Sequence, residues 1–378
     1  MIRIGIDASN LRGGGGVTHL VEVLRTARPE EHGISAVTVW SGSETGAQLP
    51  SRPWLRVVCE PELDGSLGQR LRWQRTRLGE LARAACDLLF VPGGTYTSDF
   101  RPVVAMCQNM LPFDLRERAR FGLLSKTFIR LSLLHFVQLR AFRKADGVIF
   151  LSELARERVL GNASNRVAVV PHGVSDAFRR EPREARPLDE YSFERPFRFL
   201  YTSIIDMYKH QSTLAEAVMR LREEGMPVAL DLVGPSSHQA RRLLDKAVAR
   251  DRHGVIQIRG NVPYGELPAT YEAADAFVFA STCENMPNIL LEAMAAGLPI
   301  ACSRREPMPR FLGDGGIYFE PTDVNDTAAA LRRLATDHTL RARLAATAFT
   351  RAQTFSWDAC ARQTFEFLAN VAVAARQQ

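Results

Sequence analysis

Residues 276–297 read AFVFASTCENMPNILLEAMAAG, a short apolar run followed by a polar turn and a helical pattern. The apolar run predicts a buried strand, and the pattern predicts a helix with Pro287 in its first turn, where a missing N–H costs nothing. The N–H groups of Met286, Asn288 and Ile289 would then lie at the positive end of the helix dipole and form an anion site. The stretch therefore predicts one strand–loop–helix unit of a parallel α/β sheet.

Two carboxylates flank this anion site. Glu284 lies just before the expected helix and Glu292 lies in its second turn, on the same face as Asn288, four residues earlier. Such an arrangement can hold a sugar hydroxyl, a ribose diol and a diphosphate together. The alternative is a pair of solvated glutamates on an amphipathic helix.

The same alternation continues along the whole chain and predicts a doubly wound α/β fold. The expected strands of the first half are Ile2–Asp7, Ala36–Trp40, Leu55–Cys59, Asp87–Val91, Pro102–Cys107, Gly147–Leu151 and Val167–Pro171. Those of the second half are Phe197–Ser203, Val228–Val233, Val255–Arg259, Ala276–Ala280, Pro299–Cys302 and Gly316–Phe319. The expected helices of the second half include Leu214–Glu224, His238–Arg250, Ile289–Gly297 and Asp326–Thr336.

Between the two halves, the proline-rich and charged segment 176–196 predicts a linker between domains. We expect two Rossmann-like domains that face a central cleft, at residues 1–185 and 195–352, and a final segment at 353–378. Ligands of such sheets bind beyond the carboxyl ends of the strands, so the cleft is the expected site.

Length and composition agree with two globular domains. The chain has 378 residues, of which 46% are hydrophobic and 24% charged, and domains usually have about 100–200 residues. No apolar run reaches the roughly 18 residues that a membrane-spanning helix needs. The N-terminus has no signal-peptide pattern. The six cysteines are far apart and include no C-x-x-C pair, so we expect neither structural zinc nor a disulfide framework, and a cytoplasmic location.

The net charge is +6, and the basic residues are 44 arginines and only four lysines. A nucleic-acid-binding protein is expected to show a basic face with exposed aromatic residues or a known binding module, and the sequence contains neither. We interpret the arginine excess as the codon bias of a GC-rich genome rather than as a nucleic-acid-binding surface. We therefore expect no nucleic-acid partner.

Two further motifs follow the first strand of each half. FRFLYTSIIDMYKHQSTLAEAVMRL, residues 197–221, places Lys209 at the expected start of a helix, where its charge can neutralise a departing diphosphate. DASNLRGGGGVTHL, residues 7–20, contains a glycine run that lets the backbone approach a phosphate or sugar closely. It does not complete a G-x-G-x-x-G fingerprint. His19 either faces the cleft, or is a histidine that packs against a helix or lies at the surface.

Together these motifs resemble the retaining GT-B glycosyltransferases of glycosyltransferase family 4, whose Glu-x7-Glu signature matches Glu284-NMPNILL-Glu292. The resemblance implies that Glu292 holds the nucleotide ribose and that Glu284 contacts the donor sugar beside its reacting carbon. Glu284 and Lys209 are the expected catalytic residues. The other expected substrate-binding residues are Asn288, Met286, Pro287, Ser203, Gly14, Gly15, Gly16, His19, Gln108 and Asn109.

The resemblance covers nearly the whole chain. ADGVIFLSELARERV (residues 145–159), with Ser152, resembles the end of the family's first domain. VAVVPHGV (residues 167–174) resembles its hinge. FSWDACARQTFEFL (residues 355–368) resembles the terminal helix that crosses back to the N-terminal domain. By the same resemblance, the N-terminal domain would bind the acceptor and the C-terminal domain the nucleotide sugar.

The chain departs from the family pattern at three places. Ile204 takes the position of a common arginine, the pair Gln108-Asn109 takes that of His-Asp, and Arg310 replaces an acidic residue. Without the arginine, we expect stabilisation of the leaving group to rely more on Lys209 and the helix dipole. The other two departures concern acceptor or donor-sugar recognition. No D-x-D motif occurs in the sequence, so we expect metal-independent catalysis without a cofactor.

Residues 113–146 carry eight basic residues against three acidic ones, with phenylalanines and leucines between them. A basic amphipathic helix lies well on an anionic bilayer, so the surface Arg116–Lys144 could dock on the inner face of the membrane. The alternative is a core-packed helix with solvated arginines.

The expected function is a retaining, metal-independent transfer of a hexose from a nucleoside-diphosphate sugar to a hydroxyl of a growing, lipid-linked bacterial glycan. GDP-mannose is the donor expected from the family. One alternative is a nucleotide-sugar epimerase of the same architecture. The other is a sugar-nucleotide-binding protein without turnover, which the departures at Ile204, Gln108 and Arg310 favour.

Overall fold

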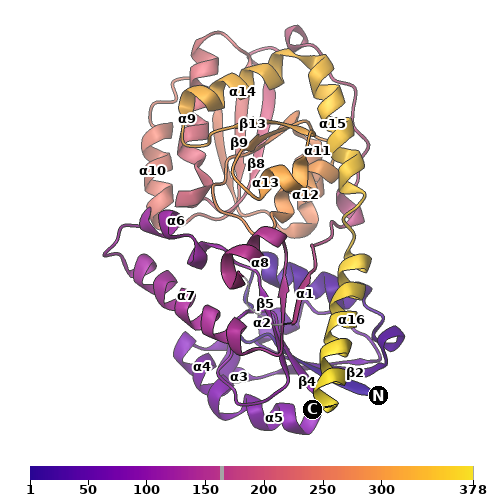
Figure 1. Cartoon of the computed structure of the whole chain (residues 1–378). Helices are drawn as coiled ribbons and strands as arrows, with labels where there is room; N and C mark the ends of the chain where they lie inside the picture. The colour runs from indigo at the N-terminus through magenta and orange to yellow at the C-terminus, as the bar shows by residue number, and fades with distance from the viewer. Residues whose placement is uncertain (162–165, 378) are drawn as a thin grey trace. The chain divides into compact units, whose positions relative to one another are not determined.

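The computed structural model describes residues 1–161 and 166–377, which form two units (Figure 1). Unit 1 comprises residues 1–115, 124–173 and 356–378, and unit 2 comprises residues 116–123 and 174–355. Each unit is a parallel sheet with helices connecting its strands. This confirms the predicted fold class of two Rossmann-like domains.

Unit 1 has a parallel sheet in the order β3-β2-β1-β4-β5-β6-β7, counted over the described residues. Its strands are β1 (Ile2–Asp7), β2 (Ile34–Ser41), β3 (Leu55–Cys59), β4 (Leu88–Val91), β5 (Val103–Cys107), β6 (Gly147–Phe150) and β7 (Arg166–Val169). Strands β4, β5 and β6 are buried along their whole length, because helices cover both faces of a parallel sheet.

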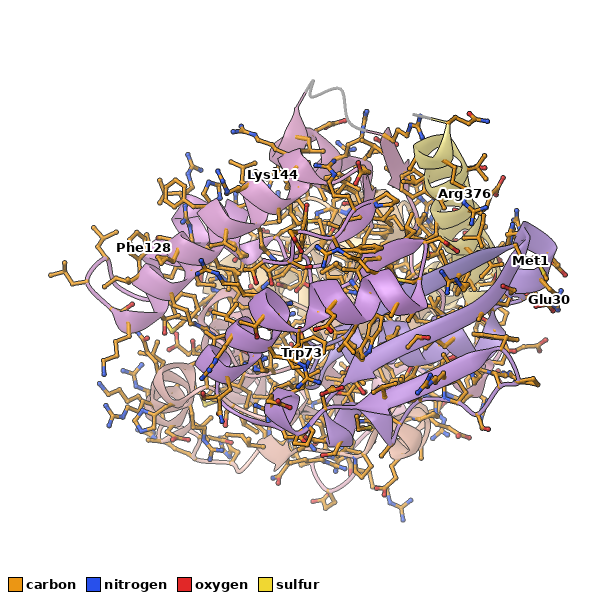
Figure 2. All side chains as sticks on the ribbon, turned by 90° about the horizontal axis from the view of Figure 1, so that it is seen from below. Met1, Glu30, Trp73, Phe128, Lys144 and Arg376 are labelled. Atoms are coloured by element: carbon orange, nitrogen blue, oxygen red, sulfur yellow. The ribbon has the colours of Figure 1, made fainter. Side chains whose placement is uncertain are left out.

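The helices of unit 1 connect these strands. They are α1 (Gly15–Thr26), α2 (Ser43–Gly46), α3 (Pro61–Asp64), α4 (Leu67–Thr76), α5 (Leu78–Ala85), α7 (Lys126–Lys144), α8 (Glu153–Leu160) and α16 (Trp357–Arg376). Helix α6 (Leu115–Ala119) begins at the last residue of the first unit 1 segment and continues into unit 2. The last helix, α16, packs against α1, β1 and β4. Consequently both chain ends lie in unit 1, where Arg376 donates a hydrogen bond to the Met1 carbonyl at 3.3 Å (Figures 1 and 2).

Unit 2 has a parallel sheet in the order β10-β9-β8-β11-β12-β13. Its strands are β8 (Phe197–Thr202), β9 (Val228–Val233), β10 (Ile256–Gly260), β11 (Ala276–Phe279), β12 (Ile300–Ser303) and β13 (Gly316–Phe319). Its helices from α9 onward are α9 (Gln211–Glu223), α10 (His238–Val248), α11 (Leu267–Glu272), α12 (Asn288–Ala295), α13 (Met308–Leu312), α14 (Val324–Thr336) and α15 (His338–Ala352). Helix α9 packs against α10 and α14, whereas α12 packs against α15 and α13 (Figure 1).

The segment between the units differs from the expected linker. The structure divides the chain at 173/174 rather than at 185, and residues 176–196 belong to unit 2. The Arg183 side chain donates to the carbonyls of Glu272 and Ala274, and the Tyr191 hydroxyl donates to Asp275 at 2.8 Å. These contacts attach the segment to the unit 2 surface. A high content of proline and charge therefore marked an irregular segment here, not a free one.

Close backbone approach explains one glycine beside this division. A Cβ at Gly173 would lie 2.1 Å from the Trp357 backbone nitrogen, at the start of α16. Any larger residue would push α16 away from the end of the β7 loop. Because Gly173 has no side chain, the last helix can begin directly against it.

Candidate active site

The candidate site of unit 2 lies where its strand order reverses. The sheet runs outward from β8 in one direction and from β11 in the other, and β8 and β11 are hydrogen-bonded neighbours. At such a switch point the loops that follow the two strands diverge and leave a crevice for a ligand. Lys209 lies in the loop after β8 and Glu284 in the loop after β11. The fold therefore brings the two expected catalytic residues to one edge of the sheet.

Lys209 and Glu284 form an ion pair between Nζ and Oε1. The side chains are nearly buried, with exposed fractions of 7% and 14%. The Lys209 ammonium also lies 5.1 Å from the ring centre of Tyr208 and 5.3 Å from that of Phe279. Aromatic faces attract a cation and shield it from water, so the charge of Lys209 is held firmly in place.

The position of Lys209 differs in one respect from the prediction. It ends a 3₁₀ turn at Met207–Lys209, and α9 begins two residues later, at Gln211. Lys209 is therefore not in the first turn of the helix. The loop after β11 brings the opposite charge of Glu284 to the same place, so the two side chains form an ion pair.

Glu292 is buried in the second turn of α12 and is held by aromatic hydroxyls. The Tyr271 hydroxyl donates to Glu292 Oε2 at 2.9 Å and shares a second hydrogen bond with the Thr202 hydroxyl. Burial raises the pKa of Glu292 to about 7, and hydrogen bonds from Tyr271 and Tyr264 lower it in part. A carboxyl group with this pKa is half ionised near neutral pH.

Helix α12 begins at Asn288, one residue before the predicted start at Ile289, and Pro287 is its N-cap rather than part of its first turn. The N–H groups of Leu290 and Leu291 both bond to the Pro287 carbonyl, at 3.0 and 3.3 Å. Met286 and Pro287 are buried, whereas Asn288 is half-buried at the helix entrance. The residues of the predicted anion site thus lie at the positive end of this helix.

Ser203 and Ile204 follow β8. The Ser203 N–H donates to the Val233 carbonyl at 2.8 Å. A Cβ at Gly234 would lie 2.2 Å from the backbone carbonyl oxygen of Ser203. Ile204 exposes 41% of its surface, and its carbonyl accepts from the Gln211 amide at 3.0 Å. No charge is present at position 204, where the family often has arginine. The other departure in this unit, Arg310, bonds to Glu306 at 3.1 Å.

Tyr271, Thr282 and His210 were not predicted as site residues. His210 Nε2 lies 3.2 Å from Thr282 Oγ1, in the loop that carries Glu284. Burial lowers the pKa of His210 to about 4, so the imidazole is neutral at physiological pH. The only signal in the sequence was the position of His210 beside Lys209. For Tyr271, in a helix before β11, there was none.

The part of the chain that contains this site matches a known protein family. A family model described as glycosyl transferases group 1 matches residues 196–337, which contain Lys209, Glu284 and Glu292. This part of the chain is a group 1 glycosyltransferase domain.

The relatives of this domain include bacterial proteins named as sugar transferases. The chain is 32% identical over 192 residues to an O-antigen chain mannosyltransferase B of Escherichia coli, covering 50% of each chain. It is 29% identical over 212 residues to a D-inositol 3-phosphate glycosyltransferase of Pseudarthrobacter chlorophenolicus, covering 53% of this chain and 50% of the relative. The chain thus spans about half the length of the curated relatives it matches.

The fold is also that of solved glycosyltransferase structures. The structure of a sucrose-phosphate synthase from Thermosynechococcus elongatus aligns with a TM-score of 0.74 and 19% identity, over 100% of this chain and 99% of the other. The likeness establishes the fold alone. Unit 2 contains the group 1 glycosyltransferase domain. Together with unit 1 it has the GT-B type of fold.

In unit 1, the glycine loop and Gln108 lie together. Gly14, the N-cap of α1, has a φ of 67°, which favours glycine, and a Cβ on Gly16 would lie 2.9 Å from Gln108 Oε1. Gly15 is the first residue of α1. Asn109 is exposed, and its side chain accepts from the Leu111 N–H at 2.9 Å. The loops after β1 and β5 thus bring the glycine run and Gln108 together.

His19 lies in the interior of unit 1. Its side chain is fully buried, with its ring centre 4.8 Å from that of His172 and 5.9 Å from that of Trp357. Burial, with the nearby His172, holds the pKa of His19 well below its usual range. Of the two alternatives, the structure shows the packing one. The reason is that α16 covers this face of α1.

No helix within the described residues, 1–161 and 166–377, is both long and apolar enough to cross a membrane. No cluster of three or more His, Cys, Asp or Glu side chains there could hold a metal ion.

Proposed function

We propose that the chain is a retaining, metal-independent glycosyltransferase that moves a hexose from a nucleoside diphosphate to a hydroxyl of a lipid-linked bacterial glycan. The observation that carries the proposal is the Lys209–Glu284 ion pair at the β8/β11 switch point of a group 1 glycosyltransferase domain. A cation for the leaving diphosphate and a carboxylate for the donor sugar lie in direct contact there. The missing D-x-D motif supports a reaction without a metal ion.

In this proposal the donor rearranges the charges of the site. The diphosphate binds Lys209 and the first turn of α12, so the ammonium exchanges its contact with Glu284 for one with the phosphate. Glu284 is then free to face the sugar ring. Glu292 accepts hydroxyl groups of the ribose.

The reaction breaks the bond between the anomeric carbon and the diphosphate oxygen. The acceptor oxygen forms the new bond on the same face of the sugar, and its proton passes to the departing diphosphate. Lys209 stabilises the negative charge that develops on the leaving group, and such preorganised electrostatic stabilisation is usually the largest single contribution to catalysis. Glu284 stabilises the positive charge that develops at the sugar ring.

Mannose is the proposed sugar and GDP-mannose the proposed donor. Support comes from the name of the Escherichia coli relative, a mannosyltransferase of O-antigen chains, which is 32% identical over half of this chain. The acceptor would then be a growing polysaccharide chain. Unit 1, with the glycine loop and Gln108, is the proposed acceptor-binding unit.

A donor-turnover assay tests the proposal. With GDP-mannose and a glycan acceptor, we expect transfer with retained configuration, and the same rate in EDTA as in magnesium. The reason is that Lys209 and the α12 N–H groups supply the positive charge. Loss of transfer in EDTA that magnesium or manganese restores would contradict metal independence. Epimerised donor without transfer would favour an epimerase, and selective nucleotide binding without turnover would favour a binding protein.

Glu292→Ala is expected to weaken donor binding more than it slows turnover. A lost hydrogen bond to a charged group corresponds to about 1–3 kcal/mol of binding free energy. Isothermal titration calorimetry with the nucleoside diphosphate measures the change. Glu223→Gln, at an exposed position of α9, is the matched control. An unchanged affinity in Glu292→Ala would remove Glu292 from the ribose site.

The same titration has an expected pH dependence. Ribose hydroxyl groups donate hydrogen bonds, so they prefer the ionised form of Glu292, whose pKa in the empty protein is about 7. Nucleotide affinity is therefore expected to fall as the pH decreases below 7, by up to about tenfold per pH unit. Glu292→Gln is expected to abolish this dependence.

The exposed face of α7 supports membrane docking as part of this function. Apolar side chains on α7 and just before it are exposed, and Phe136 exposes 69% of its surface. The exposed apolar residues are Leu123, Leu124, Ile129, Leu133, Phe136 and Val137. The helix contains five basic residues and no acidic one. In Figure 2, where Phe128 and Lys144 mark it, α7 runs along the outside of unit 1 with side chains projecting outward.

The surface is shorter than the predicted one, Arg116–Lys144. Residues 116–119 form α6, in unit 2, and Arg118 is buried. The proposed membrane surface is therefore the α7 face that carries Ile129, Leu133, Phe136 and Arg140, which recur at helical spacing.

The combined variant Arg130→Glu/Arg140→Glu is expected to reduce binding to anionic liposomes but not to neutral ones. Each basic residue near an anionic surface contributes about 1 kcal/mol, and salt screens this attraction. Cosedimentation at low and high salt measures the effect. Arg75→Glu, at an exposed position of α4, is the control. Transfer to a water-soluble acceptor should be unchanged, because Lys209 and Glu284 lie in unit 2. Wild-type protein that ignores anionic liposomes at low salt would refute the membrane surface.

A further inference from the structure

His210 has a backbone conformation that its side chain disfavours. Its φ is 52° and its ψ is 33°, and every other positive φ in the described part of the chain belongs to glycine. A residue with a Cβ is strained in this left-handed region. Such strain is retained where the surrounding structure or the function requires a particular side chain. The position therefore raises the question of what the imidazole does.

The imidazole joins the two loops that carry the expected catalytic residues. His210 is buried, and its Nε2 lies 3.2 Å from Thr282 Oγ1. Thr282 in turn bonds twice to the Tyr208 carbonyl, with its N–H at 2.9 Å and its hydroxyl at 3.2 Å. With the single hydroxyl proton of Thr282 directed to the Tyr208 carbonyl, the His210 tautomer that carries a hydrogen on Nε2 donates to Thr282. Three hydrogen bonds thus tie residues 208–210 to Thr282.

These bonds enclose the ion pair. Lys209 lies between Tyr208 and His210, and Glu284 follows Thr282 by two residues. Any change in the spacing of the two loops would therefore alter the distance between the Lys209 ammonium and the Glu284 carboxylate. The low pKa of His210 keeps the ring neutral, so it adds no charge that would compete for Glu284.

We propose that His210 is a positioning residue that, through Thr282, holds Lys209 and Glu284 at the spacing that sugar transfer requires. This inference rests on the proposed function for its consequence, the reaction rate. It assigns His210 no contact with the substrate. Its left-handed backbone turns the chain directly after Lys209, and its ring fixes the turn to the β11 loop.

His210→Gly separates the side chain from the backbone. Glycine relieves the strained φ and removes the hydrogen bond, so a purely conformational role predicts a variant that is as active as wild type or more so. The positioning role predicts that kcat for the nucleoside-diphosphate hexose falls about tenfold, as for one lost hydrogen bond, while nucleotide affinity changes less than twofold.

Four companion variants sharpen the test. Thr282→Val should lower kcat like His210→Gly, and the double variant should be no worse than either, since both remove one linked contact. Thr282→Ser keeps the hydroxyl and should restore the rate. His210→Asn, which tolerates this backbone and can donate, should retain more activity than His210→Gly. Ser237→Ala removes a 3.1 Å bond to Asp206 in the same loop and should leave kcat unchanged.

A readout independent of turnover uses the scarcity of lysine. The chain has four lysines, and Lys126, Lys144 and Lys246 are exposed. In isotope-labelled protein, the NMR signal of the Lys209 side chain should therefore stand apart. We expect it to shift toward the exposed lysines in His210→Gly and Thr282→Val, and to stay in Ser237→Ala.

The outcomes are distinguishable. An unmoved Lys209 signal in folded His210→Gly, or a wild-type kcat in that variant, would overturn the positioning role. Wild-type protein that transfers no sugar would refute the proposed function instead. The Lys209 signal would then still decide whether His210 positions the ion pair.

Discussion

Lys209→Ala is expected to lower kcat by about 10²–10³-fold, the range found when one preorganised group is removed from a developing negative charge. Lys209 is the cation that the fold places at the β8/β11 switch point, between the rings of Tyr208 and Phe279. Its charge interacts most strongly with the diphosphate as that group departs. Donor affinity should therefore change much less than kcat.

The measurement is steady-state turnover together with nucleotide binding and thermal unfolding. Removing one partner of a nearly buried ion pair also destabilises a protein, so unfolding must be followed separately. Lys246→Ala, at an exposed position of α10, is the matched control. Near-wild-type turnover in Lys209→Ala would instead support the alternative of a protein that binds sugar nucleotides without turnover.

Glu284→Gln is expected to lower kcat by a similar factor, about 10²-fold or more, without weakening nucleotide binding. The amide keeps the shape of the side chain but cannot stabilise positive charge at the sugar ring. In the protein without donor, Glu284 forms an ion pair with Lys209 and so competes with the diphosphate for it. The Glu284→Gln substitution removes this competing charge. The affinity for the nucleoside diphosphate should therefore stay the same or increase.

Calorimetry and turnover together identify this pattern. Glu223→Gln again controls for the loss of one carboxylate, and Glu284→Ala should resemble Glu284→Gln in kcat. A fall in nucleotide affinity as large as the fall in kcat would contradict the exchange of Lys209 between Glu284 and the diphosphate. The roles of the two residues would then need to be reassigned.

Local patterns in the sequence predicted most of the secondary structure. Strands β1, β3, β9 and β13 have the predicted bounds, and the other strands differ by one or two residues at their ends. Runs of Val, Ile and Leu encode a buried parallel strand because each residue in such a strand faces a helix layer. The places of Glu284 and Glu292 were also predictable, because the two residues lie in one continuous strand–loop–helix unit of the sequence.

Contacts between residues that are distant in the sequence could not be predicted from such local patterns. Nothing near Glu292 indicates that Tyr271 donates a hydrogen bond to it. The interior place of His19 depends on α16, more than 300 residues later. The segment 176–196 gave no local sign that its side chains bond to unit 2.

Neighbouring residues thus encode the alternation of strands and helices, the two-domain α/β class and the Glu-x7-Glu signature, because periodicity and chain direction act over a few turns. The packed chain was needed to show that Lys209 meets Glu284 across 75 residues, that burial raises the pKa of Glu292 to about 7 and that His210 joins the two loops. Each depends on the order of β8 and β11 in the sheet and on burial. Both arise when the whole chain packs.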